Sequence, residues 1–122
     1  MLPAWSPDGK KIAFQSTPIS VDAWEIYTIN ADGTGEKALT NNQMYGSLPD
    51  WSPDGQRIVF DGFTGIHVIN AEGKGLRPLQ GGTDPAWSPD GKKIAFRGAD
   101  ERGDDEIATM NPDGSGRTAR FL

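Results

Sequence analysis

The sequence contains no cysteine and only one histidine, and these two scarcities exclude several kinds of chemistry. Without cysteine there can be no disulfide, no thiolate zinc site and no cysteine nucleophile. The single histidine, His67, lies between Ile66 and Val68 in a stretch that reads as a strand, without an evident nucleophilic partner. We therefore expect His67 to be structural, and we expect the chain to be non-enzymatic, with no cofactor and no metal site.

Basic residues and long apolar runs are also scarce. Twelve Lys and Arg stand against seventeen Asp and Glu, for a net charge of −5, and no stretch gathers enough of them to follow a phosphate backbone. No apolar run approaches the ~20 residues that span a bilayer, and Met1 is followed by Leu2-Pro3 instead of a signal-peptide core. The sequence predicts neither a nucleic-acid partner nor a membrane span, and its composition does not define a compartment.

Helical periodicity is missing too, and a threefold repeat stands in its place. One phrase is AWSPDGKKIAF at residues 4–14, DWSPDGQRIVF at 50–60 and AWSPDGKKIAF again at 86–96. A second phrase is EIYTINADGTGEKAL at 25–39, GIHVINAEGKGLRPL at 65–79 and EIATMNPDGSGRTAR at 106–120. Each repeat unit therefore contains two phrases in a fixed order.

Each phrase is typical of a β-hairpin. Ser6-Pro7-Asp8-Gly9 suits a type I turn with proline second and glycine last. After this turn Ile12 and Phe14 fall on one side of an extended chain and Ala13 on the other, which indicates a sheet covered on both faces. Four short strands in each unit of about 40 residues are typical of propeller blades. We expect one propeller segment over 1–122, with blades at about 2–41, 42–80 and 81–122.

PAWSPDGKKIAF followed by EIYTINADG resembles the WD-like β-propeller repeat of the TolB type, over almost the whole chain. The resemblance implies an all-β fold with three four-stranded antiparallel blades, forming half of a six-bladed ring. It also implies a protein partner and a periplasmic or other extracytoplasmic location. Trp5, Trp51 and Trp87 would then pack between neighbouring blades. The second repeat departs from the others at Gly65, where they have Glu25 and Glu106.

Most polar residues of the repeats have a structural explanation. Asp8, Asp54 and Asp90 recur inside the same turn, where aspartate stabilises the backbone with its side chain. The glycines of ADGTG and AEGKG belong to turns, because neither a helix nor a Lys-Ser/Thr pair follows them. One acidic cluster stands outside the repeat, in the stretch GADERGDDEI. It is either a solvated acidic loop or a calcium-binding loop, although its spacing does not match an EF-hand.

The loops of varying length indicate where a partner would bind. In a blade, the second-to-third turns and the connections between blades share one rim, and here they include 16–24, 61–64, 97–105 and NNQMYGS at 41–47. Variable loops on one side of a repeat array usually mark its binding face. The candidate binding residues on this rim are Trp24, Met44, Tyr45, Phe63, Asp100, Glu101, Asp104 and Asp105.

Two classes of function fit these observations. The favoured one is a non-enzymatic scaffold that binds a protein through the loop-rich rim or the channel mouth. The alternative is the propeller part of a larger hydrolase, similar to the prolyl oligopeptidases or tricorn. A pectate-lyase activity would need a histidine cluster that one histidine cannot supply. Because three blades cannot close a ring, we also expect two chains to assemble into a six-bladed propeller.

Overall fold

The computed structural model describes residues 2–17, 23–41 and 44–120. Within these residues the chain forms twelve strands and no helix, so none that could cross a membrane. The first sheet contains β1 (Ala4–Trp5), β2 (Lys11–Ser16), β3 (Glu25–Asn30) and β4 (Lys37–Ala38). The second contains β5 (Ser47–Trp51), β6 (Arg57–Gly62), β7 (Gly65–Asn70) and β8 (Arg77–Pro78). The third contains β9 (Thr83–Trp87), β10 (Ile94–Ala99), β11 (Asp105–Met110) and β12 (Thr118–Arg120).

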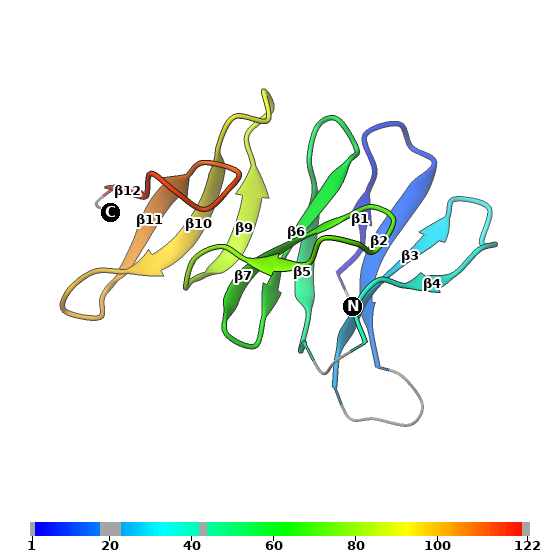
Figure 1. Ribbon diagram of the computed structural model, residues 1–122, viewed down its shortest axis with the longest axis horizontal. Helices are drawn as coiled ribbons and strands as arrows, with labels where there is room; N and C mark the ends of the chain where they lie inside the picture. The colour runs from blue at the N-terminus through cyan, green and yellow to red at the C-terminus, as the bar shows by residue number, and fades with distance from the viewer. Residues whose placement is uncertain (1, 18–22, 42–43, 121–122) are drawn as a thin grey trace.

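Each sheet is an antiparallel meander in which the strands pair in chain order. We refer to the sheets as blades 1, 2 and 3. Figure 1 shows them side by side, with the β1–β2, β5–β6 and β9–β10 turns at the same edge. The expectation of an all-β chain with three four-stranded antiparallel blades is therefore confirmed.

The first turn of each blade is held by its own side chains. The N–H of Gly9 donates to the carbonyl of Ser6 over 2.9 Å, and Gly9 adopts the left-handed φ of 72° that this turn requires. Asp8 Oδ1 accepts from the N–H of Lys10 over 3.0 Å and from Ser6 Oγ over 2.7 Å. These two donors stabilise the ionised carboxylate and lower the pKa of Asp8. Asp54 and Asp90 make the equivalent bonds, so the structural role expected for the three aspartates is confirmed.

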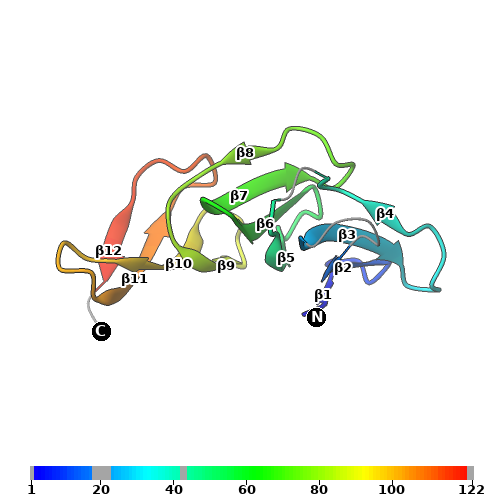
Figure 2. The same cartoon turned by 90° about the horizontal axis from the view of Figure 1, so that it is seen from below.

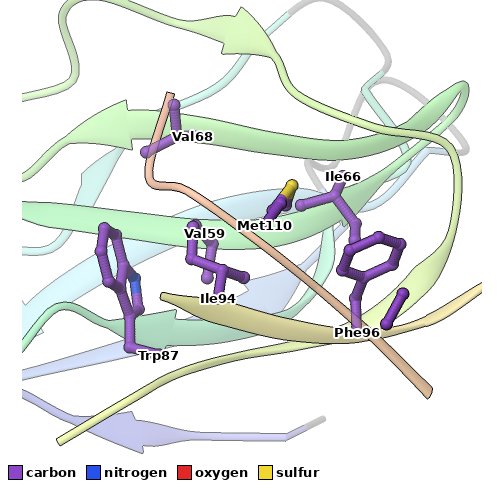
Figure 3. Packing of buried hydrophobic residues seen from close by; sticks show 8 residues of the cluster. Val59, Ile66, Val68, Trp87, Ile94, Phe96 and Met110 are labelled. Carbon is purple, nitrogen blue, oxygen red and sulfur yellow. The ribbon is translucent and has the colours of Figure 1, made fainter. Parts of the chain in front are cut away.

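The hydrophobic core lies between blades, not within one. Between blades 2 and 3 it contains Val59, Ile66, Val68, Trp87, Ile94, Phe96, Ala108 and Met110, most of which Figure 3 labels. Between blades 1 and 2 it contains Ala13, Ile26, Leu39, Trp51, Ile58, Phe60 and Ile69. Blade 2, the middle blade, therefore buries apolar residues on both faces, as the alternation along its strands predicts.

The three repeated tryptophans have different surroundings. Trp51 and Trp87 are 6% and 9% exposed, and each packs against the blade that precedes its own. The indole N–H of Trp51 donates to the carbonyl of Ala4 in blade 1 over 3.1 Å. Trp5 is 60% exposed, so the expectation that it packs between blades is wrong for the single chain. The reason is geometric: Trp51 and Trp87 each pack against the preceding blade, and no blade precedes blade 1 among the described residues.

The blades follow an arc, which Figure 2 shows from below. The inner strand of blade 2, β5, contacts the inner strands of both neighbours, β1 and β9. Two sheet faces have no neighbouring blade among the described residues. We name them the open face of blade 1, which carries Trp5, and the open face of blade 3, which carries Ile107.

Candidate protein-binding rim

One rim of the arc collects the variable loops, as the repeat analysis predicts. It contains the β6–β7 and β10–β11 turns, which Figure 1 shows at its lower edge, and the described parts of the β2–β3 and β4–β5 connections. Residues 18–22 and 42–43 of the expected loops lie outside the described residues. The other two turns are shorter than expected, because 61–62, 97–99 and 105 are strand. Asp105 is thus the first residue of β11 instead of a loop residue.

Four of the predicted binding residues lie together and form what we name the rim aromatic cluster: Trp24, Met44, Tyr45 and Phe63. The N–H of Phe63 donates to the carbonyl of Met44 over 2.7 Å, and the N–H of Gly46 donates to the carbonyl of Trp24 over 2.9 Å. The rings of Tyr45 and Phe63 lie 5.6 Å apart at 41°. Three segments that are distant in the sequence are therefore joined by backbone bonds.

The aromatic rings of this cluster face solvent. Trp24 is 52% exposed, Tyr45 is 47% exposed and Phe63 is 76% exposed, whereas Met44 is half-buried. Tyr45 has a φ of 53°, in the left-handed region that residues other than glycine rarely adopt. Holding a non-glycine residue there costs about 1 kcal/mol or more, and such residues concentrate at functional sites.

The buried carboxylate of Glu25 supports the rim aromatic cluster by a hydrogen bond to the backbone of Met44. Glu25 was not predicted as a site residue. Glu25 is 1% exposed, and its Oε1 accepts from the N–H of Met44 over 2.9 Å. The hydroxyl of Thr40 donates to Glu25 Oε2 over 3.2 Å. The sequence feature that could have indicated its role is the glycine at the same repeat position of blade 2, Gly65. Because a buried carboxylate needs donors, Glu25 fixes the position of the β4–β5 connection.

The acidic residues of blade 3 form a compact turn. Asp100 Oδ1 accepts from the N–H of Arg102 over 2.8 Å and from the N–H of Asp104 over 2.9 Å. The guanidinium of Arg102 lies 3.8 Å from Asp100 Oδ2 and 3.5 Å from Asp104 Oδ2. Glu101 and Asp105 are exposed. This acidic turn lies on blade 3, whereas the rim aromatic cluster lies on blades 1 and 2.

An open pocket of about 670 Å³ lies beside the acidic turn. Its lining residues are Ala99, Asp100, Glu101, Arg102, Glu106, Arg117 and Ala119. Arg117 Nη2 donates to the buried Glu106 Oε1 over 2.7 Å, and the guanidinium lies 5.8 Å from the Phe96 ring centre. Arg117 was not predicted as a site residue, although it stands where the other repeats have Glu36 and Leu76. The pocket therefore presents charges of both signs.

The residues that the structure describes contain no group of three or more His, Asp or Glu side chains placed to hold a metal ion. Asp100 is engaged by backbone donors of its own turn. His67 is 7% exposed, stacks on Phe60 at 5.8 Å and has its Nδ1 3.0 Å from the carbonyl of Gly65. These contacts are those of a packed structural side chain.

Carboxylates and amides also connect the inner parts of successive blades. Gln15 Oε1 accepts from the N–H of Leu48 over 3.3 Å, and Asp61 Oδ1 accepts from the N–H of Asp84 over 3.1 Å. Leu48 and Asp84 both precede proline and have φ of 53° and 54°. Burial raises the pKa of Asp61 to about 6, against the lowering by the Asp84 N–H. Each accepting side chain thus joins one blade to the inner strand of the next.

Sheets of four antiparallel strands, packed face to face along an arc with their loops on two rims, define a β-propeller segment. A model of the TolB beta propeller domain matches residues 1–117. The chain belongs to the TolB beta propeller domain family. This confirms the resemblance drawn from the repeated phrases. No curated protein matches the chain.

Solved structures agree with this assignment. A protein from Agrobacterium tumefaciens assigned to TolB is 25% identical with a TM-score of 0.81, over 98% of this chain and 49% of that protein. TolB from Acinetobacter baumannii is 23% identical with a TM-score of 0.81, over 98% of this chain and 31% of that protein. The β-propeller domain of the Trilobed protease from Pyrococcus furiosus is 15% identical with a TM-score of 0.72, over 99% and 42%. The chain thus spans about half or less of the length of these proteins.

Proposed function

We propose that this propeller segment is a non-enzymatic scaffold that binds a protein partner through the rim aromatic cluster. The observation that carries the proposal is the exposure of Trp24, Tyr45 and Phe63 on segments joined by backbone hydrogen bonds. Large aromatic side chains on a supported backbone supply contact area at a small cost in conformational entropy. They are enriched at the energetic centres of protein interfaces.

The charge of the rim selects among partners. Exposed carboxylates of the acidic turn, Glu101 and Asp104, lie on the same rim, and the chain has a net charge of −5. A partner with an apolar or aromatic segment and nearby Lys or Arg residues would match this surface, because complementary charge favours association and discriminates between partners. The partner class implied by TolB, a protein, agrees with this chemistry.

Self-assembly belongs to the same proposal. The open faces of blades 1 and 3 expose apolar side chains, including Trp5 at 60% and Ile107 at 45%. Soluble proteins seldom leave such sheet faces uncovered. A second copy of the chain would cover both at once and close a six-bladed ring, with the loop-rich rims of both copies on the same side.

Partner binding is tested by affinity capture with matched variants. The immobilised chain is compared with Trp24→Ala and Phe63→Ala for proteins retained from a cell extract, and one retained protein is then titrated in purified form. Leu76→Ala is the control, because Leu76 is 39% exposed but lies in the β7–β8 turn on the opposite rim. We expect both rim variants to weaken binding at least tenfold and Leu76→Ala to leave it unchanged. Equal binding by all four proteins would contradict the proposal.

A second candidate function is the propeller part of a larger peptidase. It is supported by the likeness in fold to the propeller domain of the Trilobed protease. In that case the chemistry would belong to another domain, and the propeller would control access to it. Hydrolysis of a peptide library by a protein that contains this chain together with a further domain, and not by the 122-residue chain alone, would favour this candidate. Specific retention of one binding protein without hydrolysis would favour the scaffold.

A further inference from the structure

The two open faces differ sharply in exposure from the equivalent faces inside the arc. On blade 3, Ile107 is 45% exposed, whereas its counterparts Ile26 and Ile66 are both 0% exposed. On blade 1, Trp5 is 60% exposed, whereas its counterpart Trp51 is 6% exposed. The open faces therefore contain the residues of an interface between blades, but in an uncovered state.

The open face of blade 3 reproduces the face of blade 1 that receives Trp51. Within the chain, Trp51 packs with Ala4, Ala13 and Ile26 of blade 1, and its indole N–H bonds to the Ala4 carbonyl. The counterparts on blade 3 are Ala86, Ala95 and Ile107, which line an open groove of about 390 Å³ together with Asp84, Phe96 and Arg97. The groove thus has the residues that accept a tryptophan in blade 1.

Local geometry is also shared between these two blades. Residues 4–14 and 86–96 have the same sequence. Lys11 Nζ donates to Asn30 Oδ1 over 2.8 Å in blade 1, and Lys93 Nζ donates to Asn111 Oδ1 over 2.8 Å in blade 3. Blades 1 and 3 therefore agree in this sequence and in the placement of these side chains. We expect a tryptophan that packs on the face of blade 1 to pack equally well on the equivalent face of blade 3.

We propose that Trp5 of one chain packs into the groove of Ala86, Ala95 and Ile107 on a second copy and donates its indole N–H to the Ala86 carbonyl. This seam rests on the self-assembly part of the proposed function and assigns its contacts. The second copy is the occupant because both halves of the interface lie on this chain. The residues before the two tryptophans also agree: Leu2-Pro3 is followed by one residue and then Trp5, and Leu48-Pro49 is followed by one residue and then Trp51. Two chains joined head to tail would form two identical seams.

One position makes the seam different from the interface between blades 1 and 2. There the side chain of Gln15 accepts from the N–H of Leu48. The seam counterparts are Arg97 and Leu2, and a guanidinium carries only donors, so it cannot accept from a backbone N–H. The seam therefore lacks one hydrogen bond that the internal interface has. Arg97→Gln would restore the pairing found between blades 1 and 2.

The experiment measures the dimer dissociation constant by light scattering and sedimentation over a range of chain concentrations. Trp5→Ala is compared with Trp24→Ala, since both tryptophans are exposed but only Trp5 lies on the seam. We expect Trp5→Ala to weaken dimerisation at least tenfold and Trp24→Ala to change it less than about twofold. We expect Arg97→Gln to tighten it about four- to a hundredfold, because each of the two seams gains one neutral hydrogen bond and each bond contributes about two- to tenfold. Circular dichroism verifies that each variant is folded.

The outcomes separate the seam from the broader proposal. A dimer weakened by Trp5→Ala and tightened by Arg97→Gln supports the seam. If Trp5→Ala does not fold, Arg97→Gln decides alone. A dimer that neither variant changes overturns the seam but leaves self-assembly standing. A monomer at all concentrations, or a trimer, overturns both, whereas partner capture by the rim is measured independently with Trp24→Ala and Phe63→Ala.

Discussion

Replacing Trp51 by alanine tests whether packing between blades stabilises the chain. Trp51 is 6% exposed and lies among apolar side chains of two blades. Removing its ring would leave a cavity that two sheets, each held by antiparallel pairing, cannot fill by collapse. We expect the free energy of unfolding to fall by roughly 3 to 5 kcal/mol. The upper part of this range is favoured because the bond to the Ala4 carbonyl, at 3.1 Å, is lost as well.

The measurement is urea denaturation followed by circular dichroism, with Trp24→Ala as the matched control. Trp24 is 52% exposed, so its replacement should change the free energy of unfolding by less than ~0.5 kcal/mol. A loss below about 1 kcal/mol for Trp51→Ala would refute the packing role. Unfolding of Trp24→Ala would instead place Trp24 in the core and remove the best ring from the proposed binding rim.

Three further predictions concern local features. Burial raises the pKa of Asp61 to about 6. Between about pH 4 and pH 6 the folded state therefore keeps a proton on Asp61 that the unfolded state has released. The contribution of this group to the free energy of unfolding falls as the pH rises through that range. Asp61→Asn should therefore raise the free energy of unfolding at pH 7 by about 1 kcal/mol after allowance for its half-exposure, and not at pH 4, in melts at both pH values. Trp51→Phe should lower the free energy of unfolding by about 1 kcal/mol more than Trp87→Phe in urea melts. The reason is that Trp51 loses its bond to the Ala4 carbonyl, whereas the buried Trp87 Nε1 has no partner among the described residues. Gly65→Ala should cost at least ~1 kcal/mol more than Gly9→Ala, since both have positive φ but only the Gly65 Cβ would meet a carbonyl oxygen, at 2.6 Å; equal thermal melts would contradict this.

The fold could be predicted because its determinants are local and repeated three times. Asp8 holds the turn that Ser6 and Gly9 begin and end, through bonds that involve only neighbouring residues. The alternation of Ile12, Ala13 and Phe14 indicates two covered faces. In the equivalent strand of blade 2 both faces are covered, because Val59 packs toward blade 3 whereas Ile58 and Phe60 pack toward blade 1. Local hydrogen bonds and strand periodicity are the two features that a sequence displays directly.

The arrangement of the rim could be predicted only in part. Loop lengths indicated which edge varies, but the contact between Tyr45 and Phe63 depends on how a connection from blade 1 lies over a turn of blade 2. The buried Glu25 that holds Met44, and the pair of Arg117 with Glu106, depend on the same non-local placement. Residues of the same type therefore have different partners in blades 1 and 3, because their loops differ.

The three tryptophans separate local from non-local information most clearly. Trp5 and Trp87 stand in the same eleven-residue phrase, yet their exposed fractions are 60% and 9%. Since the surrounding sequence is the same, the difference comes entirely from the presence of a preceding blade. The exposure of Trp5 is thus a property of the single chain, and it changes when another sheet covers blade 1. The same tryptophan position is buried in blades 2 and 3 and exposed in blade 1. This difference indicates that Trp5 belongs to an interface, and that the other half of this interface is a blade face like those that cover Trp51 and Trp87.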